Sequence, residues 1–321
     1  GLTLTSTGAG HDSCRLDPTL AAVIADGSEF RDENNGYSPN VGNMDLFEET
    51  ADTYTLGLTL APIEGLQVAL DYYNISIEDA ISSFSNEDII EYCYNSDMPW
   101  GSDNTFCNDI SRDEEGNING IMQRVYNVDE IETSGYDLTA VYRHDLGEMG
   151  RLKFKLDYTH VIGYSQTVQS PDGPATTHYE GDLSQDLFED KGSASLSWYK
   201  DGLRIRWSTK VKGQVIASRS RYEDWQKDIE ANKERCLEGD SDCVELPEEL
   251  AFFNIPTWVK HNLSVSYKME LDNDTDLRLF GGVNNVFDNN GPYILGCRGN
   301  YDSQYGGGVG RFYYLGAEVK F

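Results

Sequence analysis

The sequence predicts an all-β protein, and more specifically a transmembrane antiparallel β-barrel with long extracellular loops. Two observations lead to this prediction. Apolar and polar residues alternate with a period of two along most of the chain, which is the pattern of strands with one apolar face. The connections between these segments are in turn short and long, which is typical of an outer-membrane barrel.

The composition agrees with strands and excludes some partners. The 321 residues include 31 Gly and 20 Tyr, which favour turns and strands over helices. Lys and Arg number 25 against 55 Asp and Glu, so the net charge is −30. This charge argues against binding to nucleic acid and against electrostatic attachment to anionic lipid. No run of 18 apolar residues is present, which excludes a transmembrane helix but not a spanning strand.

Nine segments show the alternation and are predicted to be strands. They cover residues 53–60, 66–73, 136–142, 152–159, 194–198, 203–208, 263–269, 277–283 and 313–321. The first eight form four hairpins with short connections, at 62–65, 144–150, 200–202 and 272–276. The ninth strand follows a long connection and runs to the last residue.

The remaining connections are long. They cover residues 81–120, 163–191, 213–255 and 289–310, and residues 1–50 resemble another such loop. Long loops are uncommon in compact soluble domains and are usually functional. We therefore expect the binding surface at the long-loop end, facing the cell exterior. The short turns would face the periplasm, and we expect them to be too short to form a pocket.

Alternation alone does not decide which face meets lipid, because a soluble sandwich or a lipocalin-like barrel also alternates. Three features favour the membrane barrel: the nine strands with long loops, the charged residues on the polar face, and aromatic residues near the strand ends. These aromatic residues are Tyr54, Tyr72, Tyr142, Tyr158, Trp198, Trp258 and Tyr267. The residues predicted to face lipid are Leu56, Leu58, Leu70, Leu156, Leu196, Ile205, Val265, Leu279 and Val319. Those predicted to face the lumen are Thr55, Asp157, Ser195, Arg206 and Ser266.

The six cysteines all lie in polar loop sequence. They are Cys14, Cys93, Cys107, Cys236, Cys243 and Cys297. None has CxxC spacing and the chain contains only five His, so we expect no zinc site. An even number of loop cysteines indicates disulfides and an oxidising compartment, with free thiols as the alternative.

Two cysteine pairs are close in sequence, and we expect each to form a disulfide. These are Cys93 with Cys107 and Cys236 with Cys243. Cys14 and Cys297 then remain. They pair with each other, or with a partner in a segment outside this chain.

The long loops are rich in aromatic residues beside Asp and Asn, which suits stacking on a sugar or peptide and hydrogen bonding to it. The alternative is that these rings pack the loops against each other. The candidate ligand-binding residues are Tyr94, Trp100, Trp225, Tyr293, Arg298 and Tyr301. Residues 222–236 also place Trp225, Ile229 and Cys236 along one helical face, which predicts a short helix in a loop.

Catalytic signatures are missing from the sequence. It contains no GxSxG, HExxH or Walker-type loop. The oxygen-rich stretch 113–117 lacks the spacing and the closing Glu of an EF-hand. We therefore expect no catalytic residue, no metal site and no cofactor, and the protein is not predicted to be an enzyme.

Three stretches carry a pattern that is specific in combination. They are ETADTYTLG at 49–57 with LDYYNI at 70–75, GVNNVFD at 282–288, and GRFYYLG at 310–316 followed by Lys320 and Phe321. In this order they resemble the barrel of TonB-dependent outer-membrane receptors. The final Phe321 matches the aromatic ending that the barrel-assembly machinery of Gram-negative bacteria recognises.

The resemblance implies a barrel of about 22 strands with a plugged lumen. The plug domain and an energy-coupling box would precede the barrel. Because this chain has nine predicted strands and no plug sequence, we expect it to be the C-terminal part of such a receptor. Residues 1–50 would then be an extracellular loop region and residues 51–321 the C-terminal part of the barrel. Nine strands alone would leave two unpaired edges that lipid cannot satisfy, so we expect further strands elsewhere in the protein.

The resemblance also implies a function. It predicts a receptor-transporter in the outer membrane of a Gram-negative bacterium, in contact with lipid and driven by a TonB-type energy-coupling complex. The aromatic, acidic loops favour a carbohydrate or oligosaccharide as the solute. An iron–siderophore is the second candidate, disfavoured by the negative net charge if the ferric complex is anionic. A non-transporting β-protein, either an adhesin or a soluble carbohydrate-binding module, is the alternative class.

Overall fold

The computed structural model describes residues 17–25, 34–94, 104–170, 173–237, 253–271, 275–294, 302–306 and 308–320. The chain divides into two compact units. The first comprises Gly1–Asp52, Ile75–Glu132 and Ser165–Thr177, and the second comprises Thr53–Asn74, Thr133–Tyr164 and His178–Phe321. A domain boundary between residues 50 and 51 remains a prediction.

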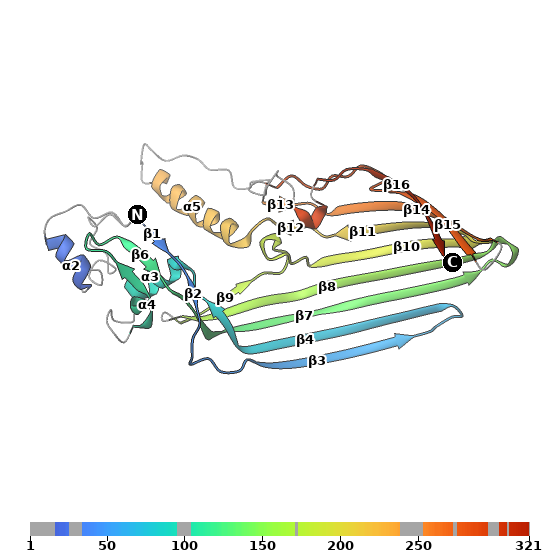
Figure 1. The fold of residues 1–321 in the computed structure, drawn as a ribbon. Coiled ribbons are helices and arrows are strands. Elements are labelled where there is room, and N and C mark those ends of the chain that lie inside the picture. Colours follow the sequence, from blue (N-terminus) through green and yellow to red (C-terminus); the bar gives the residue numbers. More distant parts are fainter. Residues whose placement is uncertain are drawn as a thin grey trace. The chain divides into compact units, whose positions relative to one another are not determined.

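The main sheet contains a path of nine strands in sequence order, each next to its predecessor (Figure 1). They are β3 (Thr50–Leu60), β4 (Leu66–Ser83), β7 (Gln123–Asp145), β8 (Arg151–Ser170), β10 (Asp190–Lys200), β11 (Leu203–Lys212), β14 (Trp258–Leu271), β15 (Thr275–Asn284) and β16 (Phe312–Lys320). Two short strands, β2 (Asn40–Val41) and β9 (Gly173–His178), pair with β7 and β8. Each of the nine predicted strands has its counterpart, and the all-β prediction is confirmed.

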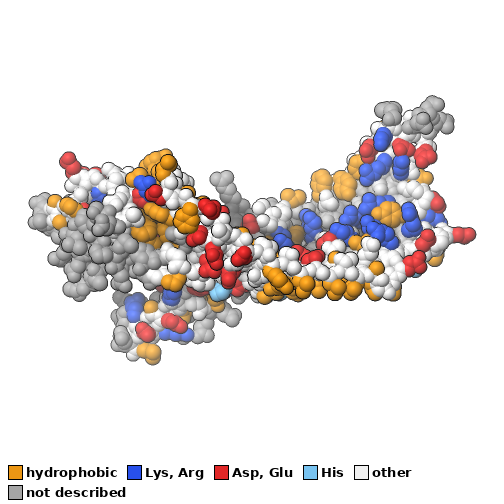
Figure 2. All heavy atoms as spheres, turned by 90° about the horizontal axis from the view of Figure 1, so that it is seen from below, with side chains coloured by type: hydrophobic (Ala, Val, Ile, Leu, Met, Phe, Trp, Pro, Cys, Tyr) orange, Lys and Arg blue, Asp and Glu red, His pale blue; other side chains and the backbone are white. Residues whose placement is uncertain are grey.

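The strand register separates the two kinds of side chain. Leu196 of β10 stands opposite Phe154 and Trp207, whereas Ser195 stands opposite Lys155 and Ser208. Seven of the nine residues predicted to face lipid are exposed, among them Leu196 at 48%, and Leu156 and Ile205 are partly exposed. Figure 2 shows hydrophobic side chains in a row along one face of the sheet and Lys and Arg side chains gathered on the other. An exposed apolar face is what a wall in contact with lipid requires.

The turn between β10 and β11 shows why its residues are Asp and Gly. Asp201 has φ 46° and Gly202 has φ 80°, the left-handed pair of a two-residue type I′ hairpin turn. A Cβ on Gly202 would lie 2.2 Å from the backbone oxygen of Lys268. The next strand therefore packs so close to the turn that only glycine fits.

Three strands extend well beyond their predicted ends, and this is a difference from the sequence analysis. β4 has 18 residues, β7 has 23 and β8 has 20. In the added segments, such as Glu132 to Ser134 of β7, polar residues occupy successive positions. A strand that leaves the lipid is no longer forced to alternate, so its pattern disappears while its backbone pairing continues.

The first unit builds a small loop domain of its own. It contains α2 (Pro18–Ala25), α3 (Asn86–Tyr94), α4 (Thr105–Asn108) and a sheet in the order β1-β6-β5, formed by β1 (Asn34–Tyr37), β6 (Ile118–Ile121) and β5 (Ile110–Arg112). Its core consists of Leu20, Phe84, Ile89, Cys93, Tyr94, Phe106, Ile118 and Ile121. The described part of the long connection 81–120 is therefore a packed structure.

The loops of the second unit also carry local structure. Two short strands pair with each other, β12 (Val215–Ile216) and β13 (Asn254–Ile255), and the helix α5 (Arg219–Leu237) follows β12. The described residues include the 3-10 helices η1 (Gly147–Met149), η2 (Leu183–Gln185) and η4 (Ser303–Tyr305). A second core, which we name the loop-base cluster, contains Leu183, Phe188, Val215, Ile255, Trp258, Ile294 and Tyr305. The predicted helix at 222–236 is confirmed, with Ile229 buried on its inner face. Among the described helices, none is both long enough and apolar enough to cross a membrane.

The second asparagine of the GVNNVFD stretch, Asn285, has a structural role. Asn285 is buried and has φ 57°. Its side chain donates to the backbone oxygen of Asn289 at 3.0 Å and accepts from the backbone N–H of Asn289 at 2.9 Å. Its own backbone N–H donates to Oδ1 of Asn262 at 2.9 Å. This residue thus fixes the exit of β15 against β14.

Candidate functional site

Tyr94 lies in the core of the first unit and is 3% exposed. Its hydroxyl donates to Oδ2 of Asp17 at 2.8 Å and accepts from Nε of Arg112 at 3.1 Å. Burial raises the pKa of the Tyr94 hydroxyl, which keeps it neutral and able to donate. In this arrangement the ring supports the loop domain and offers no open face to a ligand.

The other predicted ligand-binding residues are spread over the chain. Trp225 lies on α5, and its ring packs against Tyr222 and Phe253 with centroids 6.2 and 5.8 Å away. Tyr293 is 61% exposed. Trp100, Arg298 and Tyr301 lie outside the described residues. The packing of Trp225 favours the alternative interpretation, in which aromatic loop residues pack the loops against each other.

Among the cysteines, the structure contains the expected disulfide between Cys93 and Cys107, with their Cα atoms 4.8 Å apart. Cys236 on α5 is also disulfide-bonded. Cys14, Cys243 and Cys297 lie outside the described residues, so the pairs Cys236–Cys243 and Cys14–Cys297 remain predictions.

A cavity of about 770 Å³ lies on the polar face of the main sheet, beside the loop-base cluster. Its wall is formed by β8, β10, β11 and β14 and its edge by η4. Four lysines line this cavity, namely Lys191, Lys210, Lys212 and Lys260, and Asp157 is the one acidic residue among the described lining. Hydroxyl and amide groups complete the lining, from Thr159, Ser193, Asn262, Asn284, Ser303 and Gln304. We name this the lysine cavity.

Lys212 is held in a fixed position at the edge of this cavity. Its Nζ lies 4.4 Å from the ring centroid of Phe188 and 5.4 Å from that of Tyr305. The same atom donates to Oε1 of Gln304 at 2.7 Å. Cation–π contacts and a hydrogen bond therefore orient this ammonium group.

Trp258 was expected among the aromatic residues at the membrane interface, and this expectation is wrong. Its side chain shares the polar face with Lys260, belongs to the loop-base cluster and is 5% exposed. Its ring packs edge-on against Tyr305, with centroids 5.6 Å apart. Burial raises the pKa of the Tyr305 hydroxyl. The sequence placed Trp258 near a strand end correctly but did not reveal which face it occupies.

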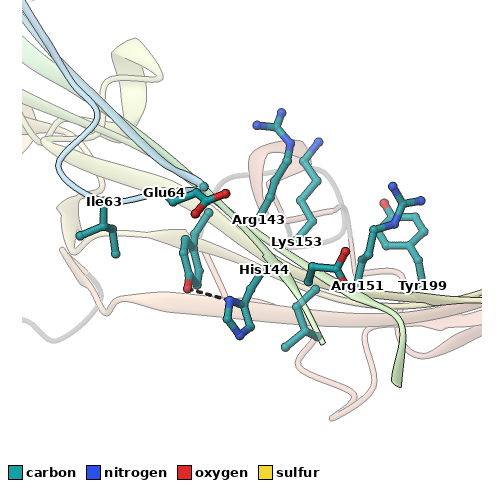
Figure 3. A pocket seen from close by; sticks show the side chains of 11 residues that line it. Ile63, Glu64, Arg143, His144, Arg151, Lys153 and Tyr199 are labelled. Atoms are coloured by element: carbon teal, nitrogen blue, oxygen red, sulfur yellow. Dashed lines mark hydrogen bonds between the residues drawn. The ribbon is translucent and has the colours of Figure 1, made fainter. Parts of the chain in front are cut away.

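A second hollow, of about 790 Å³, lies at the short-turn end, and its lining includes Ile63, Glu64 and Gly65. The expectation that the short turns frame no pocket is therefore wrong, because the ends of β7 and β8 complete the wall. Figure 3 shows Arg143 and Lys153 pointing to one side of the ribbon and His144 to the other. Because its lining residues come from both faces of the sheet, this hollow is a depression at the end of the sheet and does not lie on the polar face. We therefore favour the lysine cavity as the candidate site.

The sequence contained part of the information about the lysine cavity. Lys210 and Lys212 are two positions apart in β11, so their shared face follows from alternation. The positions of Lys191 and Lys260 depend on strand register, which alternation does not determine. The four lysines were therefore not recognised as a group.

The comparisons with known proteins concern the whole chain. A family model described as "TonB dependent receptor-like, beta-barrel" matches residues 16–286. No curated protein is significantly similar to the chain in sequence. A ferric enterobactin receptor from Pseudomonas aeruginosa is similar in structure, with a TM-score of 0.50 and 14% identity over 88% of this chain and 33% of that chain.

Two further solved structures give similar values. The FrpB iron transporter from Neisseria meningitidis has a TM-score of 0.49 and 16% identity, over 88% of this chain and 32% of that chain. The outer membrane transporter YddB from Escherichia coli has a TM-score of 0.48 and 10% identity, over 89% of this chain and 34% of that chain. This chain thus spans about a third of the length of the three structures.

The family match covers most of the chain, includes the first motif and most of the second, and agrees with the nine-strand path and with the apolar outer face. At the identity observed, the similarity to solved structures concerns the fold alone. This chain belongs to the TonB-dependent receptor-like β-barrel family, a family of the outer membrane of Gram-negative bacteria.

Proposed function

We propose that the protein is an outer-membrane receptor that takes up a scarce solute with energy from a TonB-type complex, and that the solute is a carbohydrate or oligosaccharide. The observation that carries the proposal is the division of the main sheet into an exposed apolar face and a polar face with a cavity. A wall of this kind separates lipid from a wet lumen in which a polar solute is held. Binding and transport require no covalent chemistry, so no enzymatic step is part of the proposal.

The lining of the lysine cavity supports a sugar. Asn262, Asn284 and Gln304 offer amide groups that both donate and accept hydrogen bonds, and Ser193 and Ser303 offer hydroxyls. A polyhydroxylated ligand needs many such groups at close spacing. Trp258 also borders the cavity and is 5% exposed.

The iron–siderophore remains the second candidate, because of the four lysines. The net charge of −30 disfavours an anionic ferric complex only if the acidic residues lie where the ligand binds. The described lining of the cavity has the opposite charge. One of the structurally similar proteins is named a ferric enterobactin receptor, which gives this candidate a concrete form.

The partners follow from the same proposal. Lipid would cover the exposed face that carries Leu56, Leu196 and Val265. The energy-coupling complex would act through a plug region of the full receptor. The ligand-contact roles of Trp225 and Tyr293 stay proposals, as do those of Trp100, Arg298 and Tyr301.

The experiment is a growth and uptake assay in cells that lack the receptor gene. Cells complemented with the full-length receptor are supplied with single oligosaccharides or with single ferric siderophores at limiting concentration. We expect restored uptake of an oligosaccharide, abolished when the inner-membrane energy complex is inactivated. Restored uptake of a ferric siderophore alone replaces the first candidate by the second, and a lack of dependence on the energy complex contradicts the transport proposal.

A further inference from the structure

We propose that the lysine cavity is the site for a clustered anionic group of the solute, such as the carboxylates or sulfates of an acidic oligosaccharide. The inference rests on the proposed receptor function and narrows its substrate class. It is carried by the positions of Lys191, Lys210, Lys212 and Lys260, which the register of three strands brings together.

The four lysines form two directly opposed pairs. Lys191 of β10 stands opposite Lys212 of β11, and Lys210 of β11 stands opposite Lys260 of β14. Lys210 and Lys212 are separated by one residue of β11, so both pairs lie on the same face. Like charges directly opposite each other destabilise a sheet. A sheet that contains two such pairs side by side is therefore weakened by its own charge.

Acidic residues of the described chain relieve this repulsion only in part. Asp186 and Asp302 attract the charge of Lys212, whereas Lys191 and Lys210 repel it. Asp157 lies in the lining, but its Oδ2 is already 2.7 Å from Nζ of Lys155. Within the ranges that the structure describes, Lys191, Lys210 and Lys260 form no ion pair. The cavity thus keeps excess positive charge in a chain whose net charge is −30.

The geometry favours an anion of a particular kind. Opposed residues in a sheet have Cβ atoms about 5 Å apart, so the four lysine side chains leave a small area of one face. A single small anion would contact two of them, whereas a group with several charges would contact all four. The surrounding amides and hydroxyls of the cavity bind the uncharged part of such a ligand. These requirements together describe an oligosaccharide that carries repeated acidic groups.

The test measures binding to the full-length receptor in detergent by titration calorimetry. The probes are an oligosaccharide of galacturonic acid, its methyl-esterified neutral form, and an anionic ferric tris-catecholate. We expect the acidic oligosaccharide to bind at least about tenfold more tightly than the ester, because charge-assisted contacts are lost with the carboxylates. High salt should weaken the acidic probe and leave the ester unchanged.

The matched variants separate charge from fold. The double substitution Lys210→Gln and Lys260→Gln should weaken binding of the acidic probe at least about tenfold, since it removes half of the charges. Lys210→Arg with Lys260→Arg should retain binding. The control is Lys153→Gln with Lys268→Gln, which removes the same charge from the same face outside the lysine cavity. This control should bind the acidic probe as the natural receptor does.

Heat resistance of the receptor distinguishes a ligand-binding role of the lysines from a structural one. If the lysines stabilise the fold, their replacement should lower heat resistance. Neutralising the opposed pair Lys210 and Lys260 should leave the temperature of the heat-induced mobility shift unchanged or raise it, because repulsion between the two lysines is relieved. Lower heat resistance without probe binding would mean that the lysines hold an acidic segment of the protein itself, which overturns the proposal.

The remaining outcomes distinguish this proposal from the proposed function. If the ester binds as tightly as the acid and the lysine variants behave like the natural receptor, the anionic site is wrong and carbohydrate uptake stands. If the ferric tris-catecholate binds in a lysine-dependent manner and neither oligosaccharide binds, the anionic site stands and carbohydrate uptake is wrong. Binding of none of the probes overturns the anionic site.

Discussion

Nε of Arg124 donates a hydrogen bond to Oδ1 of Asp109 at 2.6 Å, and Asp109 is 2% exposed. The other carboxylate oxygen accepts from the hydroxyl of Tyr126 at 3.2 Å, and the backbone oxygen of Asp109 accepts from the N–H of Met122 at 2.8 Å. Asp109 thereby joins the end of α4 to the start of β7 within the loop domain.

Asp109→Ala should therefore destabilise the loop domain by about 1–3 kcal/mol, because it leaves the guanidinium and the tyrosine hydroxyl without their acceptor. The measurement is the rate of trypsin cleavage of the loop on intact cells, which should increase. Glu114→Ala, at an exposed position of the same connection, is the control and should leave the rate unchanged. Equal rates for the two variants would contradict the role given to Asp109.

The disulfide between Cys93 and Cys107 closes a loop with a sequence separation of 14. Replacing both cysteines by serine should cost the loop domain about 2–4 kcal/mol, mainly because the unfolded chain gains freedom. Protease resistance of the loop on intact cells measures this effect, and mild reductant should mimic the double substitution. A loop that stays resistant after reduction would show that its core alone is sufficient.

Leu196 lies on the exposed apolar face of β10. Leu196→Arg should destabilise the assembled receptor by up to about 2–4 kcal/mol, the cost of a charged side chain on the lipid face at the bilayer midplane. Ser195→Arg, one residue away on the polar face, is the matched control and should assemble normally. The amount of heat-modifiable receptor in the outer membrane gives the comparison. If the serine variant fails and the leucine variant assembles, the faces are reversed.

Gly202 is the second residue of the type I′ turn. Gly202→Ala should destabilise the β10–β11 hairpin by about 1–3 kcal/mol, because its φ is positive and its Cβ would clash with the backbone of Lys268. Asp201→Gly in the same turn should be neutral or slightly stabilising, since glycine adopts the left-handed conformation without strain. Thermal unfolding of the two variants tests the turn directly.

The strands could be predicted from the sequence because the two faces of the main sheet meet different environments. Lipid on one side and a wet lumen on the other impose a period of two, so residues such as Leu196 and Ser195 could be assigned to faces before the structure was known. At Glu132 to Ser134, three polar residues follow one another, the period of two is absent, and the extension of β7 beyond its predicted start was missed. The helix α5 was predicted because Ile229 and Trp225 repeat at helical spacing.

The candidate site was predicted less well, for two physical reasons. The same local sequence can place an aromatic loop residue in a core or in water. The residues near Tyr94 therefore gave no indication that it would be buried. Strand register is set by pairing between distant segments, so the opposition of Lys210 and Lys260 is invisible in either strand alone. The lysine cavity depends on which strands pair and in which register, and neither can be predicted from the local sequence of one strand.

The length of β7 has a consequence for how the protein varies. At about 3.3 Å per residue, its 23 residues extend for about 76 Å, whereas about 9–11 residues cross the hydrocarbon. More than half of this strand therefore lies outside the lipid and does not need an apolar residue at every second position. With the long loops facing the cell exterior as predicted, this part is accessible to an antibody or a phage. Its side chains can change under such pressure while the segment that anchors the receptor in the bilayer stays the same.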